Sequence, residues 1–329
     1  MLHKIKQSKI LVIGDLMLDI YLYGKAERIS PEAPVPVVAA EKEESLPGGA
    51  ANVMSNLSHL GCHVFGAGYI GKDETGRILW NKLNDLHINT ECIVHSNLST
   101  IHKTRVIANG QHVVRFDFDQ NYEQLKEEKQ NFIGLLTTLS SYHFDAVIVS
   151  DYNKGTINKN VMDTIKSVFH CPIICDTKPQ HKDIFHDVWC ITPNIQEAKQ
   201  LFGLEAHTKT SIEIAKKLKQ EMNLKTILVT MADQGVMGID EQDTIFQYPA
   251  YIEFNEHNPK TRLDVTGAGD TLISVFAACV AAGIPTQKAV LFSNIAAGIV
   301  VKKTGTAVCS FDELISEVEK HENSTPQIQ

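Results

Sequence analysis

The sequence lacks a long hydrophobic run and an excess of basic charge. The longest apolar stretch, residues 273–282, is interrupted by Ser274 and is much shorter than the roughly 20 apolar residues that cross a bilayer. Lys and Arg number 31 against 39 Asp and Glu, which gives a net charge of -8. Proteins that coat nucleic acid are normally basic. We therefore expect neither a membrane nor a nucleic acid as a partner, whereas a phosphorylated small molecule stays possible.

The sequence also lacks a metal-binding or disulfide pattern among its seven cysteines. There is no CxxC, and the closest pair, Cys171 and Cys175, has no second Cys/His pair at zinc spacing. The apolar run before Gly14 is too short for the core of a signal peptide. We therefore expect free thiols in a reducing compartment and a cytoplasmic protein.

Short apolar runs alternate with helical segments along most of the 329 residues. The runs are 10–13, 64–65, 146–149, 173–174, 189–191 and 227–229. The predicted helices are 50–60, 74–85, 122–139, 158–168, 195–202, 209–220, 268–282, 285–302 and 311–320. Continuous apolar runs are typical of parallel strands buried on both faces. The pattern predicts an α/β fold with a doubly wound, mostly parallel sheet flanked by helices.

Two stretches interrupt this alternation and predict a small antiparallel β lid. Residues 17–40 contain three prolines, which favour edge strands. Residues 91–118 contain Asn109-Gly110 between two β-rich runs, which is a strong hairpin signal. We expect one domain over residues 1–322 with these lid strands inserted, followed by a polar tail at 323–329.

The segment from Gly66 to Gly71 has the form G-x-G-x-x-G and lies between a predicted strand and a predicted helix. Glu91 follows about 20 residues on, as a dinucleotide-binding fingerprint requires. That fingerprint usually occupies the first strand-to-helix turn, which here is Gly14-Asp15-Leu16-Met17. The alternative interpretation, a tight turn without a ligand, is the one we favour.

Gly48 and Gly49 precede a predicted helix that contains Asn52. Glycines before a helix let a ligand approach the backbone N–H groups, and a carboxamide both donates to and accepts from a sugar hydroxyl. The alternative is a glycine-rich helix start with a capping Asn.

The segment from Asp264 to Thr271 is the most informative part of the sequence. Gly267, Ala268 and Gly269 place unpaired N–H groups at a helix N-terminus, which suits a phosphoryl group. Asp270 follows them, where it can accept a proton from an attacking hydroxyl. An N-cap Asp is the alternative, but it explains neither the glycines nor Asp264 and Thr266.

Phosphoryl transfer also needs charge neutralisation, usually by magnesium. Asn194 and Glu197 lie at positions i and i+3 after a predicted strand. They can hold metal-bound water or a phosphate tail, or they can form a helix capping box.

These residues together resemble the ribokinase-like, PfkB-type carbohydrate kinases over nearly the whole length. The N-terminal signature is similar to Gly48-Gly49-Ala50-Ala51-Asn52, Leu60-Gly61 and residues 68–76, and the C-terminal signature to residues 264–270. Within the family, the chain resembles the kinases of D-glycero-β-D-manno-heptose 7-phosphate. That likeness rests on residues 14–19, 28–38, 115–118, 150–155 and 303–306. The chain departs from this pattern at Ile20 and at residues 176–179.

The resemblance implies a reaction and a role for each matching residue. The γ-phosphate of ATP would pass to O1 of the heptose 7-phosphate, with Asp270 as base and the amides of Gly267, Ala268 and Gly269 as anion hole. Magnesium would be held through water by Glu197 and Asn194, and a monovalent cation is possible. The sugar pocket would contain Asp15, Asp19, Gly48, Gly49 and Asn52. The ATP site would contain Asn194, Glu197, Thr230, Asp233, Gly235, Asp264, Thr266, Asn294 and Ala297.

The substrate's own phosphate needs further cations, because it lies opposite the reacting end. Arg105, Lys154 and Lys178 are the candidates, and a solvated surface charge is the alternative for each. The exposed edges of the lid also favour a homodimer. The length leads us to expect a stand-alone kinase.

Three alternatives to this function stay open at this point. The chain could be a PfkB-type kinase for another sugar, sugar phosphate or nucleoside. It could be an NAD(P)-dependent oxidoreductase that uses residues 66–71, or a sugar-phosphate binding protein without activity.

Overall fold

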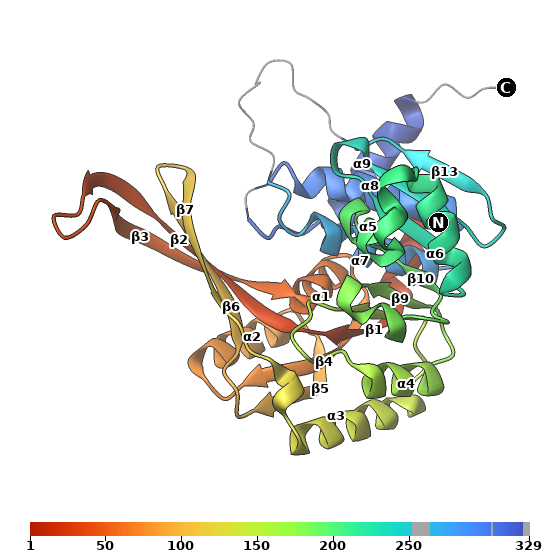
Figure 1. Ribbon diagram of the computed structural model, residues 1–329, viewed down its shortest axis with the longest axis horizontal. Coiled ribbons are helices and arrows are strands. Elements are labelled where there is room, and N and C mark those ends of the chain that lie inside the picture. The colour runs from red at the N-terminus through yellow and green to blue at the C-terminus, as the bar shows by residue number, and fades with distance from the viewer. Residues whose placement is uncertain (252–263, 304, 325–329) are drawn as a thin grey trace.

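The computed structural model describes residues 1–251, 264–303 and 305–324, and among them the main sheet has nine strands (Figure 1). Their order is β13-β12-β11-β10-β9-β8-β1-β4-β5. The strands are β1 (Lys9–Gly14), β4 (His63–Gly71), β5 (Asn89–Ser96), β8 (Ala146–Ser150), β9 (Ile173–Asp176), β10 (Cys190–Ile191), β11 (Thr226–Thr230), β12 (Val236–Ile239) and β13 (Ile245–Tyr248). Neighbours from β5 to β11 are parallel, and β12 and β13 are antiparallel. The predicted doubly wound, mostly parallel fold is confirmed.

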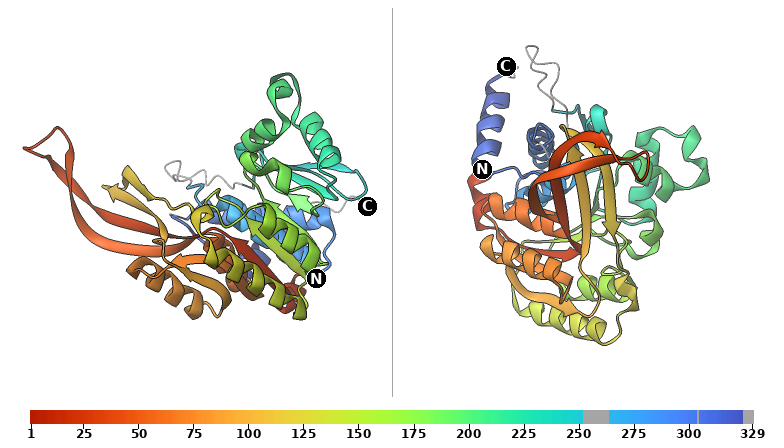
Figure 2. Two further views of the ribbon diagram at one scale, coloured as in Figure 1. Left: turned by 60° about the horizontal axis from the view of Figure 1, so that its bottom comes forward. Right: turned by 90° about the vertical axis from the view of Figure 1, so that its left-hand side faces the viewer.

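Helices cover both faces of this sheet, as Figure 2 shows from two further sides. One face carries α1 (Ala50–His59), α2 (Glu74–Asp85), α7 (Ala268–Ala281), α8 (Thr286–Val300) and α9 (Phe311–Ser324). The other face carries α3 (Glu127–Thr138), α4 (Lys159–Val168), α5 (Ile195–Phe202) and α6 (Ser211–Glu221). Short 3-10 helices are η1 (Leu2–Gln7), η2 (Tyr122–Gln124), η3 (Leu139–Ser141), η4 (Pro179–Ile184), η5 (Leu204–Thr208) and η6 (Ala232–Gln234).

Strand β1 shows why its apolar run is continuous. Ile10 and Val12 pack into the core on one face, Leu11 and Ile13 pack into the core on the other face, and all four are fully buried. A central strand covered on both sides therefore needs an apolar residue at every position. Helix α9 continues to Ser324, so residues 323 and 324 of the predicted tail are helical and the rest of the tail lies outside the described residues.

A second, smaller sheet extends away from the main body (Figure 1). We call it the small sheet, and its strands in order are β3 (Pro36–Gly49), β2 (Leu16–Ile29), β6 (Ile101–Ala108) and β7 (Gln111–Phe118). The outer pairs are antiparallel as predicted, but the central pair, β2 and β6, is parallel. Both strands leave the same edge of the main sheet, β2 after β1 and β6 after β5, so they run in the same direction.

The boundaries of the small sheet differ from the predicted ranges. Residues 91–96 belong to β5 of the main sheet, and β3 continues to Gly49 rather than ending near residue 40. The hairpin at Asn109-Gly110 is confirmed, because these two residues join β6 to β7 with φ values of 52° and 74°. Positive φ at both central residues matches the twist of the flanking strands.

The small sheet has two chemically different faces. The register places Lys103 opposite Asp117 and Arg105 opposite Arg115, so these charged residues share one face. Alternate residues of β7, namely Val114, Phe116 and Phe118, lie on the opposite face and are 43–54% exposed. On β7, one face is therefore charged and the other is apolar.

The G-x-G-x-x-G segment lies inside β4, so our interpretation of it as a tight turn was wrong. A Cβ on Gly66 would lie 2.8 Å from the Met54 sulfur, and one on Gly68 would lie 2.5 Å from the Gly14 carbonyl oxygen. These glycines let α1 and β1 pack closely against β4. A segment paired on both sides with β1 and β5 offers no loop for a pyrophosphate.

In the described part of the chain, no helix is long and apolar enough to cross a membrane.

Candidate active site

The carboxyl ends of three parallel strands and the N-terminus of α7 meet at one edge of the main sheet. Asp15 follows β1, Tyr152 follows β8, and Asp176 is the last residue of β9. Ligand sites in α/β folds form at this edge because the loops after the strands converge there.

Asp270 lies in the first turn of α7 and is 6% exposed. The N-cap residue of this helix, Gly267, has a left-handed conformation with φ 79°. A Cβ at Gly267 would lie 2.9 Å from the Asn52 amide nitrogen, so the close approach of α1 to α7 requires glycine here. The predicted segment thus places Asp270 beside α1 (Ala50–His59).

Two neutral groups donate hydrogen bonds to the Asp270 carboxylate. Asn52 Nδ2 donates to Oδ2 at 2.8 Å, and the Tyr152 hydroxyl donates to Oδ1 at 2.7 Å. Burial and the charge of Asp19 raise the pKa of Asp270 to about 6, although the two hydrogen bonds and Lys178 lower it. A carboxylate with a pKa in this range is mostly ionised at neutral pH and suits a general base.

The two donors are themselves fixed in place. Asn52 Oδ1 accepts a hydrogen bond from Asn56 Nδ2 at 3.3 Å, which orients the Asn52 amide group. Burial and the charge of Asp270 raise the pKa of Tyr152 well above its ordinary value, so Tyr152 stays a neutral donor. The predicted sugar-pocket residue Asn52 therefore uses its amide nitrogen on the base.

Asp15 shapes the loop that carries Tyr152. Its buried carboxylate accepts hydrogen bonds from the amides of Tyr152, Lys154 and Thr156 at 2.8, 3.1 and 3.1 Å. Burial and the charge of Asp151 raise the pKa of Asp15. These contacts commit Asp15 to positioning the loop, and a sugar contact for it stays a prediction.

Asp19, near the start of β2, forms a buried ion pair. Arg105 Nη1 donates to Asp19 Oδ1 at 2.6 Å, and the Thr306 hydroxyl donates to Oδ2 at 2.9 Å. A Cβ on Gly48 would lie 2.7 Å from Asp19 Oδ2, and one on Gly49 would lie 2.7 Å from the Asp15 carbonyl oxygen. Arg105, predicted to bind the substrate phosphate, is thus already paired with a carboxylate.

The other two predicted phosphate-binding cations are also paired. Lys154 contacts Asp119 at 2.7 Å, and Lys178 contacts Glu197 at 2.5 Å. Asp176 lies close to this second pair, because Lys178 and Glu197 both act on its pKa. Burial, opposed by Lys178 and reinforced by Glu197 and Asp270, raises the pKa of Asp176 to about 8.

Asn194 and Glu197 form the capping box that was one of their two predicted roles. Asn194 Oδ1 accepts from the amides of Gln196 and Glu197, and Glu197 Oε2 accepts from the Asn194 amide at 3.0 Å. The Asn194 amide nitrogen, Nδ2, donates no hydrogen bond to any described residue, so this NH₂ group is available to a ligand.

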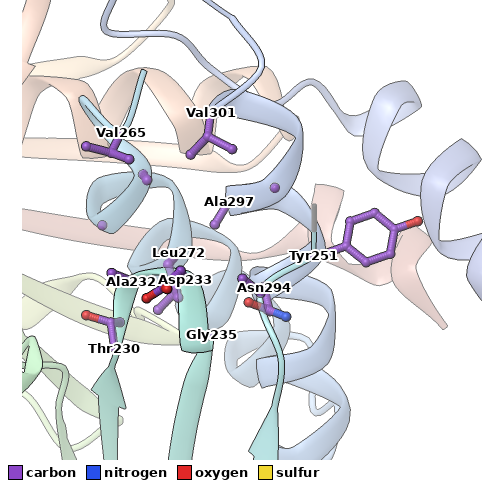
Figure 3. A pocket seen from close by; sticks show the side chains of 14 residues that line it. Thr230, Ala232, Asp233, Gly235, Tyr251, Val265, Leu272, Asn294, Ala297 and Val301 are labelled. Carbon is purple, nitrogen blue, oxygen red and sulfur yellow. The ribbon is translucent and has the colours of Figure 1, made fainter. Parts of the chain in front are cut away.

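An apolar cavity of about 440 Å³ lies next to the first turn of α7 (Figure 3). Its lining includes five predicted ATP-site residues, namely Thr230, Asp233, Gly235, Asn294 and Ala297, together with Ala268 and Gly269 beside Asp270. Asn294 Nδ2 donates to the Pro249 carbonyl at 2.8 Å. The other four predicted ATP-site residues, Asn194, Glu197, Asp264 and Thr266, do not line the cavity.

Asp264 joins two loops beside this cavity. Its carboxylate accepts from the Thr266 amide at 3.0 Å and from the Gly305 amide at 2.8 Å. Burial raises the pKa of Asp264, but these hydrogen bonds outweigh burial and lower it overall. Thr304, in the stretch 303–306 that carried part of the resemblance, lies outside the described residues.

Sequence reasoning assigned no role to Tyr152 or Asp176. Both lie at the carboxyl ends of buried parallel strands, and a polar residue at that position is the signal that could have identified them.

Comparisons with known proteins agree on one family. The family model of pfkB carbohydrate kinases matches residues 7–313. The bifunctional protein HldE of Vibrio vulnificus (strain YJ016) is 37% identical over 312 residues, covering 94% of this chain and 63% of the relative. The HldE of Sulfurimonas denitrificans is 37% identical over 321 residues, covering 96% and 64%. The chain thus spans a little under two thirds of the length of these relatives.

Solved structures share the fold at lower identity. Phosphofructokinase-2 from Escherichia coli in complex with potassium has a TM-score of 0.76 at 17% identity, covering 96% of this chain and 99% of that chain. Arabidopsis thaliana ribokinase complexed with ribose and ATP has a TM-score of 0.72 at 18% identity, covering 95% and 99%. The predicted ribokinase-like fold is confirmed. With the family model matching most of its length, the chain belongs to the pfkB family of carbohydrate kinases.

Proposed function

We propose that this kinase transfers the γ-phosphate of ATP to O1 of D-glycero-β-D-manno-heptose 7-phosphate and forms the 1,7-bisphosphate. The product would supply ADP-heptose for the lipopolysaccharide inner core. The observation that carries the proposal is the buried Asp270 carboxylate, held by two neutral donors beside an apolar cavity. The choice of sugar is supported by the stretches at 28–38 and 150–155 and by the similarity to HldE proteins.

In the proposed reaction Asp270 removes the proton from the O1 hydroxyl as this oxygen attacks the phosphoryl group. The helix N-terminus stabilises the charge on the transferring group. Within the described residues, no group accepts a hydrogen bond from the amides of Gly267 and Gly269, whereas the Ala268 amide donates to the Val265 carbonyl at 3.2 Å. Gly267 and Gly269 are therefore the better supported members of the predicted anion hole.

ATP would place its adenine ring in the apolar cavity, because Ala232, Leu272 and Ala297 offer apolar surface there. The phosphates would then extend toward Gly269, which lines the cavity and adjoins Asp270. Asn194 Nδ2 is a further donor for the phosphate oxygens.

Magnesium fits this site through water rather than by direct ligation. Among the described residues, no three acidic, His or Cys side chains are grouped to hold a metal ion. Glu197 is bound to Lys178 and to the helix cap, and its charge adds to burial in raising the pKa of Asp176. Glu197 and Asn194 would hold the hydrated ion, which when bound would neutralise the ATP phosphates. A monovalent cation stays a prediction.

The test is ADP release over a panel of sugars and sugar phosphates, with wild type and Asp270→Asn. We expect heptose 7-phosphate to give the highest kcat/KM, and ³¹P NMR to show a new anomeric phosphate. The Asn variant should lose roughly 10²- to 10⁴-fold in kcat, because a positioned general base contributes that much. Turnover that favours another sugar would refute the proposed substrate, and full activity of the Asn variant would refute the role of Asp270.

We also propose that the small sheet forms a homodimer through its apolar face. Val114, Phe116 and Phe118 are exposed on that face, and exposed apolar strands are normally covered. Light scattering should give twice the chain mass for wild type and the monomer mass for Phe116→Glu. A monomeric wild type would contradict this arrangement.

A further inference from the structure

Most cations near the candidate site are already neutralised by carboxylates. The pairs are Arg105 with Asp19 at 2.6 Å, Lys178 with Glu197 at 2.5 Å, Lys154 with Asp119 at 2.7 Å and Arg115 with Asp117 at 2.8 Å. A phosphate that bound to one of these cations would have to compete with its carboxylate. Each of the three cations predicted for the substrate phosphate thus already has a carboxylate partner, and their role in binding it stays a prediction.

Lys103 on β6 differs from these cations. Among the described residues, no carboxylate forms an ion pair with Lys103. Its Nζ lies 5.8 Å from the ring centroid of Tyr152, whose hydroxyl donates to Asp270. Tyr152 thus contacts the Lys103 ammonium through its ring and the Asp270 carboxylate through its hydroxyl.

The strand register explains why Lys103 has no carboxylate partner among the described residues. Lys103 is paired with Asp19 on β2 at one side and with Asp117 on β7 at the other side. Cross-strand neighbours of opposite charge would normally form ion pairs. Here Arg105 contacts Asp19 and Arg115 contacts Asp117, so both neighbouring carboxylates are occupied.

We propose that Lys103 binds the phosphate group of the acceptor and makes the site selective for phosphorylated sugars. This inference rests on the proposed function in taking a sugar phosphate as the acceptor. A sugar whose hydroxyl meets Asp270 extends along Tyr152, and a phosphate at its far end reaches Lys103. A lysine ammonium is a mobile point charge that suits a terminal phosphate.

Lys178 strengthens this assignment because it contacts the same ring. Its Nζ lies 5.5 Å from the Tyr152 ring centroid. Lys178 retains Glu197 as its partner, so it adds positive potential without supplying the free charge. Another cavity, which is polar and lies beside Lys154, is a less suitable site for the substrate phosphate because the carboxylates of Asp119 and Glu123 line it as well.

The test compares each sugar with its phosphorylated form. Heptose and heptose 7-phosphate, and fructose and fructose 6-phosphate, are assayed by ADP release with wild type, Lys103→Met, Lys103→Arg and Lys25→Met. Lys25 is the matched control, since it is an exposed lysine of the same sheet paired with Glu41. Thermal unfolding verifies that all variants fold alike.

We expect Lys103→Met to raise the KM for the phosphorylated sugar about 10- to 100-fold, as loss of one charged hydrogen bond implies. The kcat should change little, because the contact is the same in the ground and transition states. The kcat/KM for the unphosphorylated sugar should stay at the wild-type value. Lys103→Arg should recover part of the affinity, and Lys25→Met should match wild type.

The outcomes separate this inference from the proposed function. An unchanged KM of Lys103→Met for a sugar phosphate that wild type uses would overturn the inference and leave the proposed function standing. Equal losses for both forms of a sugar would also overturn it, because Lys103 would then not act on the phosphate. If wild type prefers fructose 6-phosphate and loses that preference in Lys103→Met, the inference holds and the proposed substrate fails. If wild type accepts only unphosphorylated sugars, both fail.

Discussion

Carboxylates at the carboxyl-terminal edge of the main sheet and carboxylates on the small sheet have different kinds of partner. At the edge of the main sheet, the partners are neutral groups: Asn52 and Tyr152 donate to Asp270, and three backbone amides donate to Asp15. On the small sheet, the partners are cations: Arg105 pairs with Asp19, and Arg115 pairs with Asp117.

This difference separates a reactive carboxylate from a structural one. A neutral donor stabilises the ionised form without adding a full positive charge, so burial still raises the pKa of Asp270 to about 6. A carboxylate in contact with a guanidinium is a far weaker proton acceptor. Asp15 also has neutral donors, but these are the amides of the Tyr152 loop, which Asp15 positions. Asp270 is therefore the acid of this group whose surroundings suit a base.

The largest expected effect comes from breaking the buried ion pair of the small sheet. Arg105→Leu leaves the Asp19 carboxylate buried without a cation and should lower the free energy of unfolding by about 3–5 kcal/mol. Urea unfolding measures the loss, and hydrogen exchange of β2 and β6 shows whether it is local. Asp19→Asn combined with Arg105→Leu should recover part of the stability. A loss below about 1 kcal/mol would show that this pair behaves like a surface pair.

The next effect is a gain in stability when the base is removed. Because the pKa of Asp270 rises from 3.8 to about 6 on folding, the folded state binds the proton more tightly, and stability falls as pH rises through that window. Above about pH 6 the cost is complete, so Asp270→Asn should be more stable than wild type by about 1–3 kcal/mol at neutral pH. Urea unfolding at low and neutral pH tests this, and the difference should vanish near pH 4. A variant less stable than wild type at neutral pH would contradict it.

A smaller effect is expected from Tyr152→Phe. The variant removes a hydrogen bond that lowers the pKa of Asp270, so that pKa rises and the acid limb of the kcat/KM profile moves to higher pH. The rate should fall roughly tenfold, as one hydrogen bond to a charged group implies. Tyr23→Phe, on the small sheet, is the matched control. An unshifted profile would mean that the Tyr152 hydroxyl does not act on the base.

The smallest effect is expected where a charge pair of the small sheet is exposed. Lys25 and Glu41 are 3.1 Å apart and both side chains are more than half exposed. Lys25→Met should change the free energy of unfolding by less than about 1 kcal/mol. Comparing Lys25→Met with Arg105→Leu in the same urea experiment measures how much burial increases the contribution of an ion pair to the free energy of unfolding. Similar losses for the two variants would remove the distinction.

The fold was largely predictable from the sequence because its signals are local. Continuous apolar runs marked strands such as β1, and helical segments were predicted at all nine α-helices of the described residues. Strands β12 and β13 were not predicted, because each has only four residues and the edge strand β13 is only partly buried. The motif at Gly66 to Gly71 was misjudged, because its place inside β4 depends on pairing with distant strands.

The site was predictable in part for the same reason. Asp270 could be singled out because the glycines before it and the helix after it lie in one segment. Its contact with Tyr152 joins residues 118 positions apart, and no local pattern encodes such a contact. The pairing of Arg105 with Asp19 likewise depends on the register of two strands, so no local pattern indicated this ion pair.

The connection of the small sheet to the main body has a mechanical consequence. Strand β2 begins at Leu16, two positions after the end of β1, and β3 ends at Gly49, immediately before α1, the helix that carries Asn52. The two strands therefore continue directly into the segments that carry Asp15 and Asn52. A displacement of the small sheet at this end would move Asp15, which holds the Tyr152 loop, and would move Asn52. Both donors of Asp270 thus depend on segments that are continuous with the small sheet.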